Sequence, residues 1–301
     1  MKKSVILDVD TGIDDGVAIM LGALCDELDI KLICTCFGNT SAENSAVNTA
    51  NLLSHIGKND KKIVVGSTSG IFKTRQNVNV HGKNGLGDYP FPKQNFVFET
   101  DFVDAYKTAI LSSKEKVTIL VLGPLTNLAR VLESHPEIKN HIEQVVFMGS
   151  SLKKYGDDEI PYAGFNVACD PEATEIVLKS GLEIVFCPND LGKKCRLSPQ
   201  EVEVIKNTNK TGEMLYTIFG AYKDRQVFDG VAMYDSTTIY FLINPQDYEI
   251  RPVNIEVRYY DELETGVALA DFEKKPNAKM LVDLNVDNFK KYCFEKLKSI
   301  K

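Results

Sequence analysis

Short apolar runs recur along this chain, and most are followed by polar or glycine-rich residues and then by a helical pattern of hydrophobic spacing. The apolar runs predict strands and the pattern between them predicts helices. Chains that alternate in this way build mostly parallel sheets, because a parallel connection needs a long crossover that is usually a helix. The continuous apolar stretch Ile119–Leu122 suits a central strand covered on both faces. We therefore predict an α/β fold with an open, mostly parallel sheet and helices on both faces.

The expected elements follow one another along the chain without a repeat, a low-complexity segment or a linker. At 301 residues, one large domain spanning 1–301 is expected. The segment Ser69–Phe98 interrupts the alternation of strands and helices, because it is rich in Gly, Asn, Lys and Pro and has no clear periodicity. It is predicted to be a long functional loop or lid. Strands are expected at Ser4–Leu7, Ile30–Cys36, Lys62–Val65, Val117–Leu122, Gln144–Met148, Leu182–Cys187, Val253–Val257 and Lys279–Leu284, and helices at about Asp14–Cys25, Ala42–Ile56, Glu213–Gln226 and Ser236–Leu242, with a Lys-rich helix at the end.

Charge, hydrophobicity and cysteine content argue against a nucleic-acid-binding, membrane or secreted protein. The formal net charge of −7 disfavours nucleic-acid binding, which depends on basic patches, and favours a small substrate. No apolar stretch approaches the roughly 20 residues that cross a bilayer, and the start reaches Asp8 too soon for a signal peptide. The seven cysteines are odd in number and lie mostly in apolar runs, which favours reduced thiols in a cytoplasmic protein.

Polar residues follow several of the expected strands. Asp8 and Asp10 come at the end of the first strand, Asn39 after the second, Thr126 after Val117–Leu122, and Met148-Gly149 at the end of a later strand. In open α/β sheets, ligands bind beyond the carboxyl ends of the strands. These separate segments are therefore expected to meet at one edge of the sheet.

Four carboxylates lie close together in the segment Asp8–Asp15. Crowding them at the end of a buried strand is costly unless a proton or a cation intervenes. Acids in the first turn of a helix offer a simpler explanation for Asp14 and Asp15, but not for Asp8 and Asp10. Hard oxygen ligands without His or Cys indicate Ca²⁺ or Mg²⁺ rather than zinc.

Two families of enzymes begin in a similar way. Asp8-Val-Asp10-Thr11 resembles the opening motif of haloacid-dehalogenase-type phosphatases, in which the first Asp is the nucleophile. Those enzymes need a further Asp pair after a later apolar strand, whereas Asp157-Asp158 lies in a polar stretch. The resemblance to the phosphatases therefore ends with the first motif.

The second resemblance extends over most of the chain. Asp8–Asp15 is similar to the D-x-D-P-G-x-D-D signature of the inosine/uridine-type nucleoside hydrolases, with Thr11 where Pro is usual. Five motif blocks in register make this resemblance specific. The further motifs are Gly38-Asn39, His81–Gly87, Leu122–Ala129, Phe165-Asn166 with Asp170–Ala173, and Tyr234-Asp235.

The resemblance implies a nucleoside N-ribohydrolase with a bound Ca²⁺. The implied metal ligands are the carboxylates of Asp10, Asp15 and Asp235, together with the backbone carbonyl of Thr126. Asp10 would also act as general base on the attacking water. Ca²⁺ accepts six to eight oxygen ligands in flexible geometry, which suits such a site.

The same resemblance implies how the ribose is held. Asp14, Asn39 and Asn166 would bind its hydroxyls, and the Met148-Gly149 turn would contact the substrate. Asp8 would support the site from behind, by fixing Asp10 or the backbone of the first helical turn. The resemblance also implies a homodimer or homotetramer.

Two departures from the family pattern concern the pocket for the ribose 5′ group. Gly164 stands where the family usually has Glu, and Asp158 stands where Asn is usual. Asp158 could replace the missing carboxylate, the pocket could admit an altered 5′ group, or Asp158 could be a solvated loop acid.

The third departure concerns the leaving base. Tyr234 stands where many members carry a His that protonates the base, and a tyrosine with a pKa near 10 is a weaker acid. The enzyme could therefore favour leaving bases that need less acid assistance, or His81 or water could supply the proton. His81 is expected at the mouth of the pocket facing the base, with an ordinary surface histidine as the alternative. Tyr222, expected on a helix, could line the same pocket. A sensor that binds nucleosides without turnover remains an alternative to the enzyme.

Overall fold

The computed structural model describes residues 2–72, 74, 80–152, 164–222, 230–259 and 266–300. The strands are β1 (Lys3–Val9), β2 (Leu28–Thr35), β3 (Ile63–Val65), β4 (Val117–Val121), β5 (Ile142–Met148), β6 (Ile184–Cys187), β7 (Tyr248–Arg258), β8 (Val267–Asp271) and β9 (Ala278–Leu284). The α-helices are α1 (Ile13–Ala23), α2 (Ala42–His55), α3 (Phe102–Leu111), α4 (Thr126–Ser134), α5 (Phe165–Cys169), α6 (Pro171–Leu178), α7 (Asn189–Lys194), α8 (Pro199–Lys206), α9 (Lys210–Gly220), α11 (Tyr234–Ile243) and α12 (Val286–Lys298).

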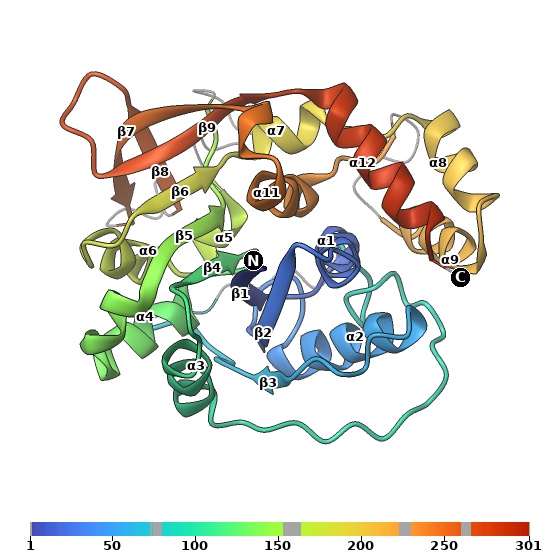
Figure 1. Cartoon of the computed structure of the whole chain (residues 1–301), viewed down its shortest axis with the longest axis horizontal. Helices are drawn as coiled ribbons and strands as arrows, with labels where there is room; N and C mark the ends of the chain where they lie inside the picture. The colour runs from blue at the N-terminus through green and yellow to red at the C-terminus, as the bar shows by residue number, and fades with distance from the viewer. Residues whose placement is uncertain are drawn as a thin grey trace.

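The strands form one nine-stranded sheet in the order β3-β2-β1-β4-β5-β6-β9-β7-β8 (Figure 1). The first seven strands in this order, β3-β2-β1-β4-β5-β6-β9, pair with one another in parallel. Strand β7 pairs antiparallel with β9 on one side and with β8 on the other. The predicted open, mostly parallel sheet is confirmed. Strand β8 was missed, because its short stretch lies in a polar region of the sequence.

One predicted helix ends earlier than expected. The pattern over Glu213–Gln226 predicted a continuous helix, but α9 ends at Gly220, a residue with poor helix propensity. The next amide, of Ala221, bonds back to the Ile218 carbonyl in a tight final turn. Tyr222 therefore follows α9 instead of lying on it. Residues 223–226 of the predicted helix lie outside the described residues. The described part of Ser69–Phe98 contains no helix or strand, in agreement with the predicted loop.

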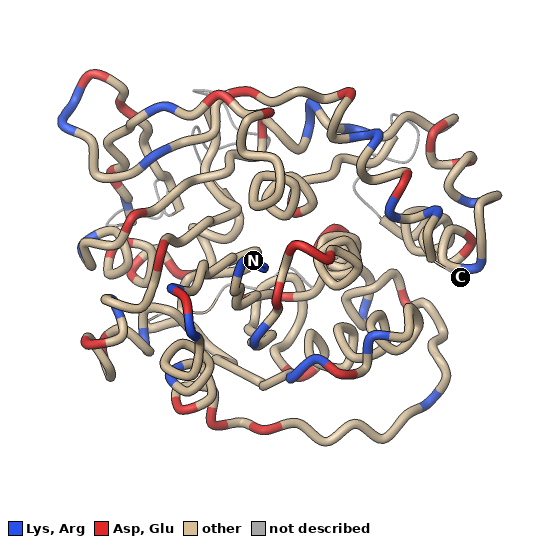
Figure 2. The backbone as a smooth tube through the Cα atoms, viewed as in Figure 1, with Lys and Arg blue, Asp and Glu red and all other residues tan. Residues whose placement is uncertain are grey.

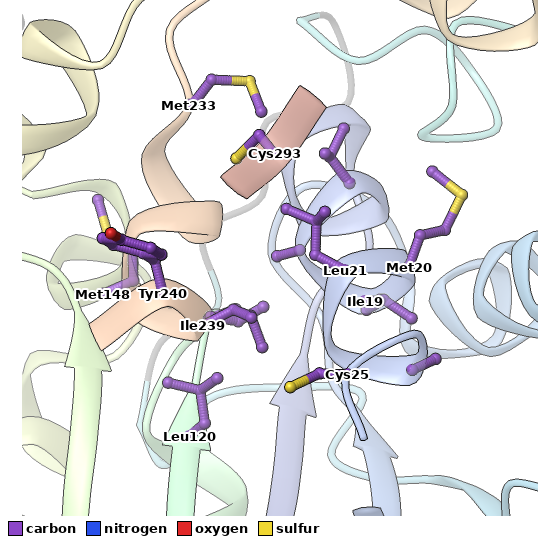
Figure 3. Close-up of a cluster of buried hydrophobic side chains, with 14 of the residues drawn as sticks. Ile19, Met20, Leu21, Cys25, Leu120, Met148, Met233, Ile239, Tyr240 and Cys293 are labelled. Atoms are coloured by element: carbon purple, nitrogen blue, oxygen red, sulfur yellow. The ribbon is translucent and has the colours of Figure 1, made fainter. Parts of the chain in front are cut away.

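Alternation along the central strands divides the apolar side chains between the two faces of the sheet. On β1, Val5 and Leu7 belong to a core packed under α1 and α11, whereas Ile6 belongs to the core under α3 and α4. Figure 3 shows Leu120 of β4 and Ile239 of α11 within the first of these cores, close to helix α1. Both faces are therefore covered by helices, as predicted.

The parallel register brings the ends of four strands to the same edge of the sheet. Val9 of β1 pairs with Thr35 of β2, and the neighbouring Asp8 is level with Val121 of β4. Val121 in turn is level with Phe147 of β5. The residues that follow these ends therefore emerge side by side, as the sequence predicted.

Most charged residues lie on the outside of the fold, and the cysteines lie inside. Figure 2 shows basic and acidic residues interspersed along the outer helices and loops. In the part of the chain that the structure describes, no helix combines the length and the apolarity that a membrane span requires. The seven cysteines are all buried thiols.

We predict that Leu120→Ala lowers the free energy of unfolding by about 2–5 kcal/mol, because it removes a fully buried side chain from the middle of the sheet. Val97→Ala is the control, because Val97 is 96% exposed, and it should change the free energy by less than about 0.5 kcal/mol. Urea unfolding of both variants measures the difference. Equal losses in the two variants would contradict this placement of Leu120.

Candidate active site

Two helix N-termini meet at the edge of the sheet where β1 and β4 end. Asp14 and Asp15 lie in the first turn of α1, and Asp235 lies in the first turn of α11. One carboxylate oxygen from each of these three residues lies within 4.8 Å of the other two. Positive helix ends favour negative charge, so both helices partly offset the repulsion between the carboxylates.

Asp10 completes the acidic group and is held tightly by its surroundings. It is fully buried, and its Oδ2 accepts a hydrogen bond from the backbone N–H of Asn39 at 2.7 Å. A Cβ atom built on Gly38 would lie 2.0 Å from this oxygen, and one on Gly123 would lie 3.0 Å from Oδ1. The two glycines are therefore what allows the loops after β2 and β4 to close around Asp10.

The pKa values show how strongly this site disfavours four negative charges. Burial, with the charge of Asp14 adding to it, raises the pKa of Asp15 to about 6, and burial raises that of Asp14 to about 6. Burial and the neighbouring carboxylates also raise the pKa of Asp10 and of Asp235 well above the ordinary range. The group is stable only with protons or with a cation among its oxygens.

The donor set fits a hard cation. Among the described residues, the Oδ1 atoms of Asp10, Asp14 and Asp15 are buried without a hydrogen-bond partner. Buried carboxylate oxygens without partners are rare unless an ion or a water satisfies them. The ligands are all oxygens, which Ca²⁺ and Mg²⁺ prefer. The prediction of a cation site is therefore supported, and Asp14 joins the group from which its ligands would come.

Asn39 and His81 close the side of the site next to α1. The Asn39 amide donates from Nδ2 to Asp15 Oδ2 at 3.0 Å, and the Ile13 N–H donates to His81 Nδ1 at 3.1 Å. His81 is only 5% exposed, so the alternative of an ordinary surface histidine is wrong. A Cβ atom on Gly12 would lie within 3 Å of both the His81 and the Asn39 side chains. The glycine between Thr11 and Ile13 is what leaves room for them.

Tyr222 lies next to His81. Their rings meet edge to face, with centroids 5.1 Å apart and planes at 88°. The end of α9 also touches the loop that carries His81, since a Cβ atom on Gly87 would lie 2.7 Å from Ala221 Cβ. The structure therefore brings His81 and Tyr222 together, as expected for two residues that line one pocket.

Asn166 bridges the ends of two strands. Its Nδ2 group donates to the carbonyls of Leu122 and Met148, the latter at 2.9 Å. Because both N–H bonds of the amide are used, its Oδ1 is the atom that a ribose hydroxyl could reach. Asn166 and the Met148 backbone thus lie together at the sheet edge.

The site departs from the family pattern at Gly164 for a steric reason. A Cβ atom on Gly164 would lie 2.6 Å from the backbone nitrogen of Ser150. Ser150 has a left-handed backbone conformation, with φ of 73°. A glutamate at this position would therefore require the loop after β5 to move. Asp158, predicted to bind near the 5′ group, lies outside the described residues.

Tyr234 packs against α7 at Gly192. A Cβ atom on Gly192 would lie 2.4 Å from Tyr234 Cδ1, so the ring occupies the space that a side chain at position 192 would need. Tyr234 is half-buried and directly precedes the metal-site residue Asp235. Tyr234 is thus the first residue of α11, next to the acidic group, and its expected role at the leaving base stays a prediction.

Asp8 does not support the site in the predicted way. Its recorded hydrogen bonds come from Tyr106 of α3 at 3.1 Å and Asn127 Nδ2 of α4 at 2.8 Å, and not from Asp10 or the first turn of α1. The reason is strand alternation, which turns Asp8 to the same face as Ile6. Asn127 also bonds to the Thr35 carbonyl and the Ser67 N–H, so it ties three strand ends together. Sequence reasoning missed this role of Asn127, although the residue stands in the Leu122–Ala129 motif.

We predict that Asp8 makes the metal-free protein less stable as the pH rises. Burial raises its pKa from 3.8 to about 7. Its stabilising contribution is complete below pH 3.8 and is lost as the pH rises through 7, because the folded protein holds the proton more tightly than the unfolded chain. Relative to Asp8→Asn, the wild type should lose up to about 1.4 kcal/mol per pH unit over that range. Urea unfolding in a chelator at several pH values measures this, and a pH-independent difference would contradict it.

Comparison with known proteins identifies the family. The inosine-uridine preferring nucleoside hydrolase family profile matches residues 5–291, which confirms the resemblance and argues against a haloacid-dehalogenase-type phosphatase. A non-specific ribonucleoside hydrolase RihC of Escherichia coli O127:H6 is 33% identical over 303 residues, with 99% of each chain covered. The solved plant nucleoside hydrolase PpNRh1 has a TM-score of 0.90 at 25% identity, covering 99% of this chain and 100% of that one. A purine-preferring ribonucleoside hydrolase from Gardnerella vaginalis shares the fold, with a TM-score of 0.89 at 23% identity and 99% of each chain covered. The chain therefore belongs to the inosine-uridine preferring nucleoside hydrolase family and is an enzyme of the nucleoside ribohydrolase type.

Proposed function

We propose that the protein hydrolyses the N-glycosidic bond of ribonucleosides, releasing free base and ribose, with a Ca²⁺ ion in the site. The observation that carries this proposal is the acidic group at the sheet edge, formed by the buried Asp10, Asp15 and Asp235 with the partly exposed Asp14. Three of the four have a buried carboxylate oxygen that lacks a hydrogen-bond partner.

Asp10, Asp15 and Asp235 would hold the ion, with the backbone carbonyl of Thr126 as a further ligand. An oxygen of Asp14 lies within 4.8 Å of oxygens of Asp15 and Asp235. Asp14 could therefore bind the ion or a ribose hydroxyl. A bound Ca²⁺ supplies positive charge that orients the ribose diol and lowers the cost of deprotonating the attacking water. Asp10 takes the proton from that water as general base.

The rest of the acidic site acts on the sugar. Breaking the N-glycosidic bond places positive charge on the ribose ring, as in glycoside hydrolysis. Nearby carboxylates stabilise that charge in the transition state without any rearrangement. Asp14, Asn39 and the Asn166 Oδ1 would position the ribose hydroxyls, and the Met148 turn would contact the substrate. Asp158 is proposed to reach the 5′-hydroxyl, since Gly164 offers no side chain.

The leaving base would lie against His81, Tyr222 and Tyr234. Because His81 Nδ1 accepts the Ile13 N–H, its ring keeps its proton on Nε2 and is neutral when that bond is made. In this state His81 donates a hydrogen bond to the base and does not act as a strong acid. Tyr234 stands where many family members have their acid, and its hydroxyl is a weaker proton donor.

The expected setting of the enzyme is part of the same proposal. We propose a cytoplasmic location, because the seven buried thiols suit a reducing compartment. From the family resemblance we also propose a homodimer or homotetramer. Sedimentation of the purified protein distinguishes these states from a monomer.

We predict that incubation with a panel of ribonucleosides and Ca²⁺ releases ribose, and that Asp10→Ala lowers the rate about 10²- to 10⁴-fold, because the general base is lost. Chelation should abolish the wild-type activity, and added Ca²⁺ should restore it. Circular dichroism of Asp10→Ala controls for folding. Binding of nucleosides without release of ribose would support the non-catalytic sensor instead, and release of phosphate from a phosphomonoester would support a phosphatase.

We predict that Tyr234→His increases the rate on inosine relative to uridine, because purine departure gains from a stronger acid at this position. Tyr234→Phe is the matched control, since it keeps the ring packed on Gly192 but removes the hydroxyl. Initial rates on both nucleosides give the ratio for each variant. An unchanged inosine-to-uridine ratio in Tyr234→His would contradict a role of this residue in protonating the base.

A further inference from the structure

Asp170 lies deep in the protein at the start of α6, outside the acidic site. Its side chain is fully buried, and its carboxylate accepts three hydrogen bonds from three separate segments. One of these bonds is the ordinary helix cap, from the Ala173 N–H to Oδ1 at 3.0 Å. The cap accounts for Oδ1 and leaves Oδ2 to be explained.

The second oxygen reaches Thr126. The Thr126 hydroxyl donates to Asp170 Oδ2 at 2.7 Å, and both residues are fully buried. Thr126 is the first residue of α4 and follows the loop that closes over Asp10. Because threonine is branched at Cβ, fixing its hydroxyl also fixes its χ1 angle and restrains the adjoining backbone.

The same oxygen also holds the start of the long loop that carries His81. The Ile71 N–H donates to Asp170 Oδ2 at 3.0 Å. Arg130 of α4 adds two bonds from its guanidinium, to the carbonyls of Ser69 and Gly70 at 3.3 and 3.2 Å. The loop start is therefore fixed beside the first turn of α4.

We infer that Asp170 is a positioning residue for the metal site, because its Oδ2 holds Thr126 in place and so keeps the Thr126 carbonyl in position as a ligand. This inference rests on the proposed function, in which that carbonyl binds Ca²⁺. Groups that orient a metal ligand from behind commonly change the affinity for the metal about 10- to 100-fold when they are removed. Helix capping alone would change stability and leave the affinity unaltered.

The test separates the two oxygens of Asp170. Thr126→Val keeps the shape of the side chain but removes the hydroxyl, whereas Thr126→Ser keeps the hydroxyl. Asp170→Asn keeps an oxygen for the α6 cap but replaces the other oxygen by an N–H donor, which cannot accept from Ile71 or Thr126. Calorimetric titration of Ca²⁺ into each purified, metal-free protein gives the dissociation constants.

Thr126→Val and Asp170→Asn should each bind Ca²⁺ about 10- to 100-fold more weakly than wild type, and Thr126→Ser should bind like wild type. The double variant Thr126→Val/Asp170→Asn should be no weaker than the weaker single variant, because both changes break the same hydrogen bond. Asp101→Ala is the matched control: Asp101 caps α3 through the Asp104 N–H at 3.1 Å, so its loss should lower the melting temperature without changing the Ca²⁺ affinity.

Other results of these titrations would overturn the positioning role of Asp170. If the wild type binds Ca²⁺ and the single variants bind equally tightly, the positioning role is overturned while the proposed function stands. Independent, additive losses in the double variant would also overturn it. If the wild type does not bind Ca²⁺, the proposed metal and this inference fail together. Should Asp170→Asn not fold, the comparison of Thr126→Val with Thr126→Ser decides alone.

Discussion

Repulsion among four neighbouring carboxylates, three of them buried, is the constraint around which this site is organised. Asp10, Asp15 and Asp235 are buried, and Asp14 is partly exposed to solvent beside them. The fold offsets the cost with two helix N-termini and with hydrogen bonds from Asn39, but oxygens on three of the four remain without protein partners. A bound cation would neutralise the remaining negative charge. The carboxylates repel one another without a cation, but with one they suit metal-assisted hydrolysis.

Close backbone approach makes this concentration of charge possible. Parallel pairing of β1 with β2 and β4 brings three loops to one edge of the sheet. Gly12, Gly38 and Gly123 let those loops surround Asp10, Asn39 and His81 at distances that a side chain would prevent. The glycines of the motifs thus have a steric role here, alongside the chemical role of the aspartates.

One part of the site follows the family pattern, and two other parts depart from it. The residues proposed to bind the metal and the ribose diol lie together at the sheet edge, whereas the positions near the 5′ group and near the base differ from the family pattern. Near the 5′ side, the backbone of Ser150 takes the space that a side chain at Gly164 would need. Near the base, the Tyr234 ring is accommodated by Gly192 of α7. Both departures are thus accommodated by a neighbouring residue.

The sequence by itself determined the fold class, most strand positions and the identity of the acidic residues, because these depend on local periodicity and on motifs within a few residues. It did not determine where Asp8 points, that His81 is buried against α1, or that α9 ends before Tyr222. Those features depend on which side chains meet across the sheet. The contact of Asp170 with Thr126 and Ile71 is the clearest case, since it joins residues 44 and 99 positions apart. Only the packed tertiary structure decides such partners, because hydrophobic burial and strand register bring together segments that carry no mutual signal in the sequence.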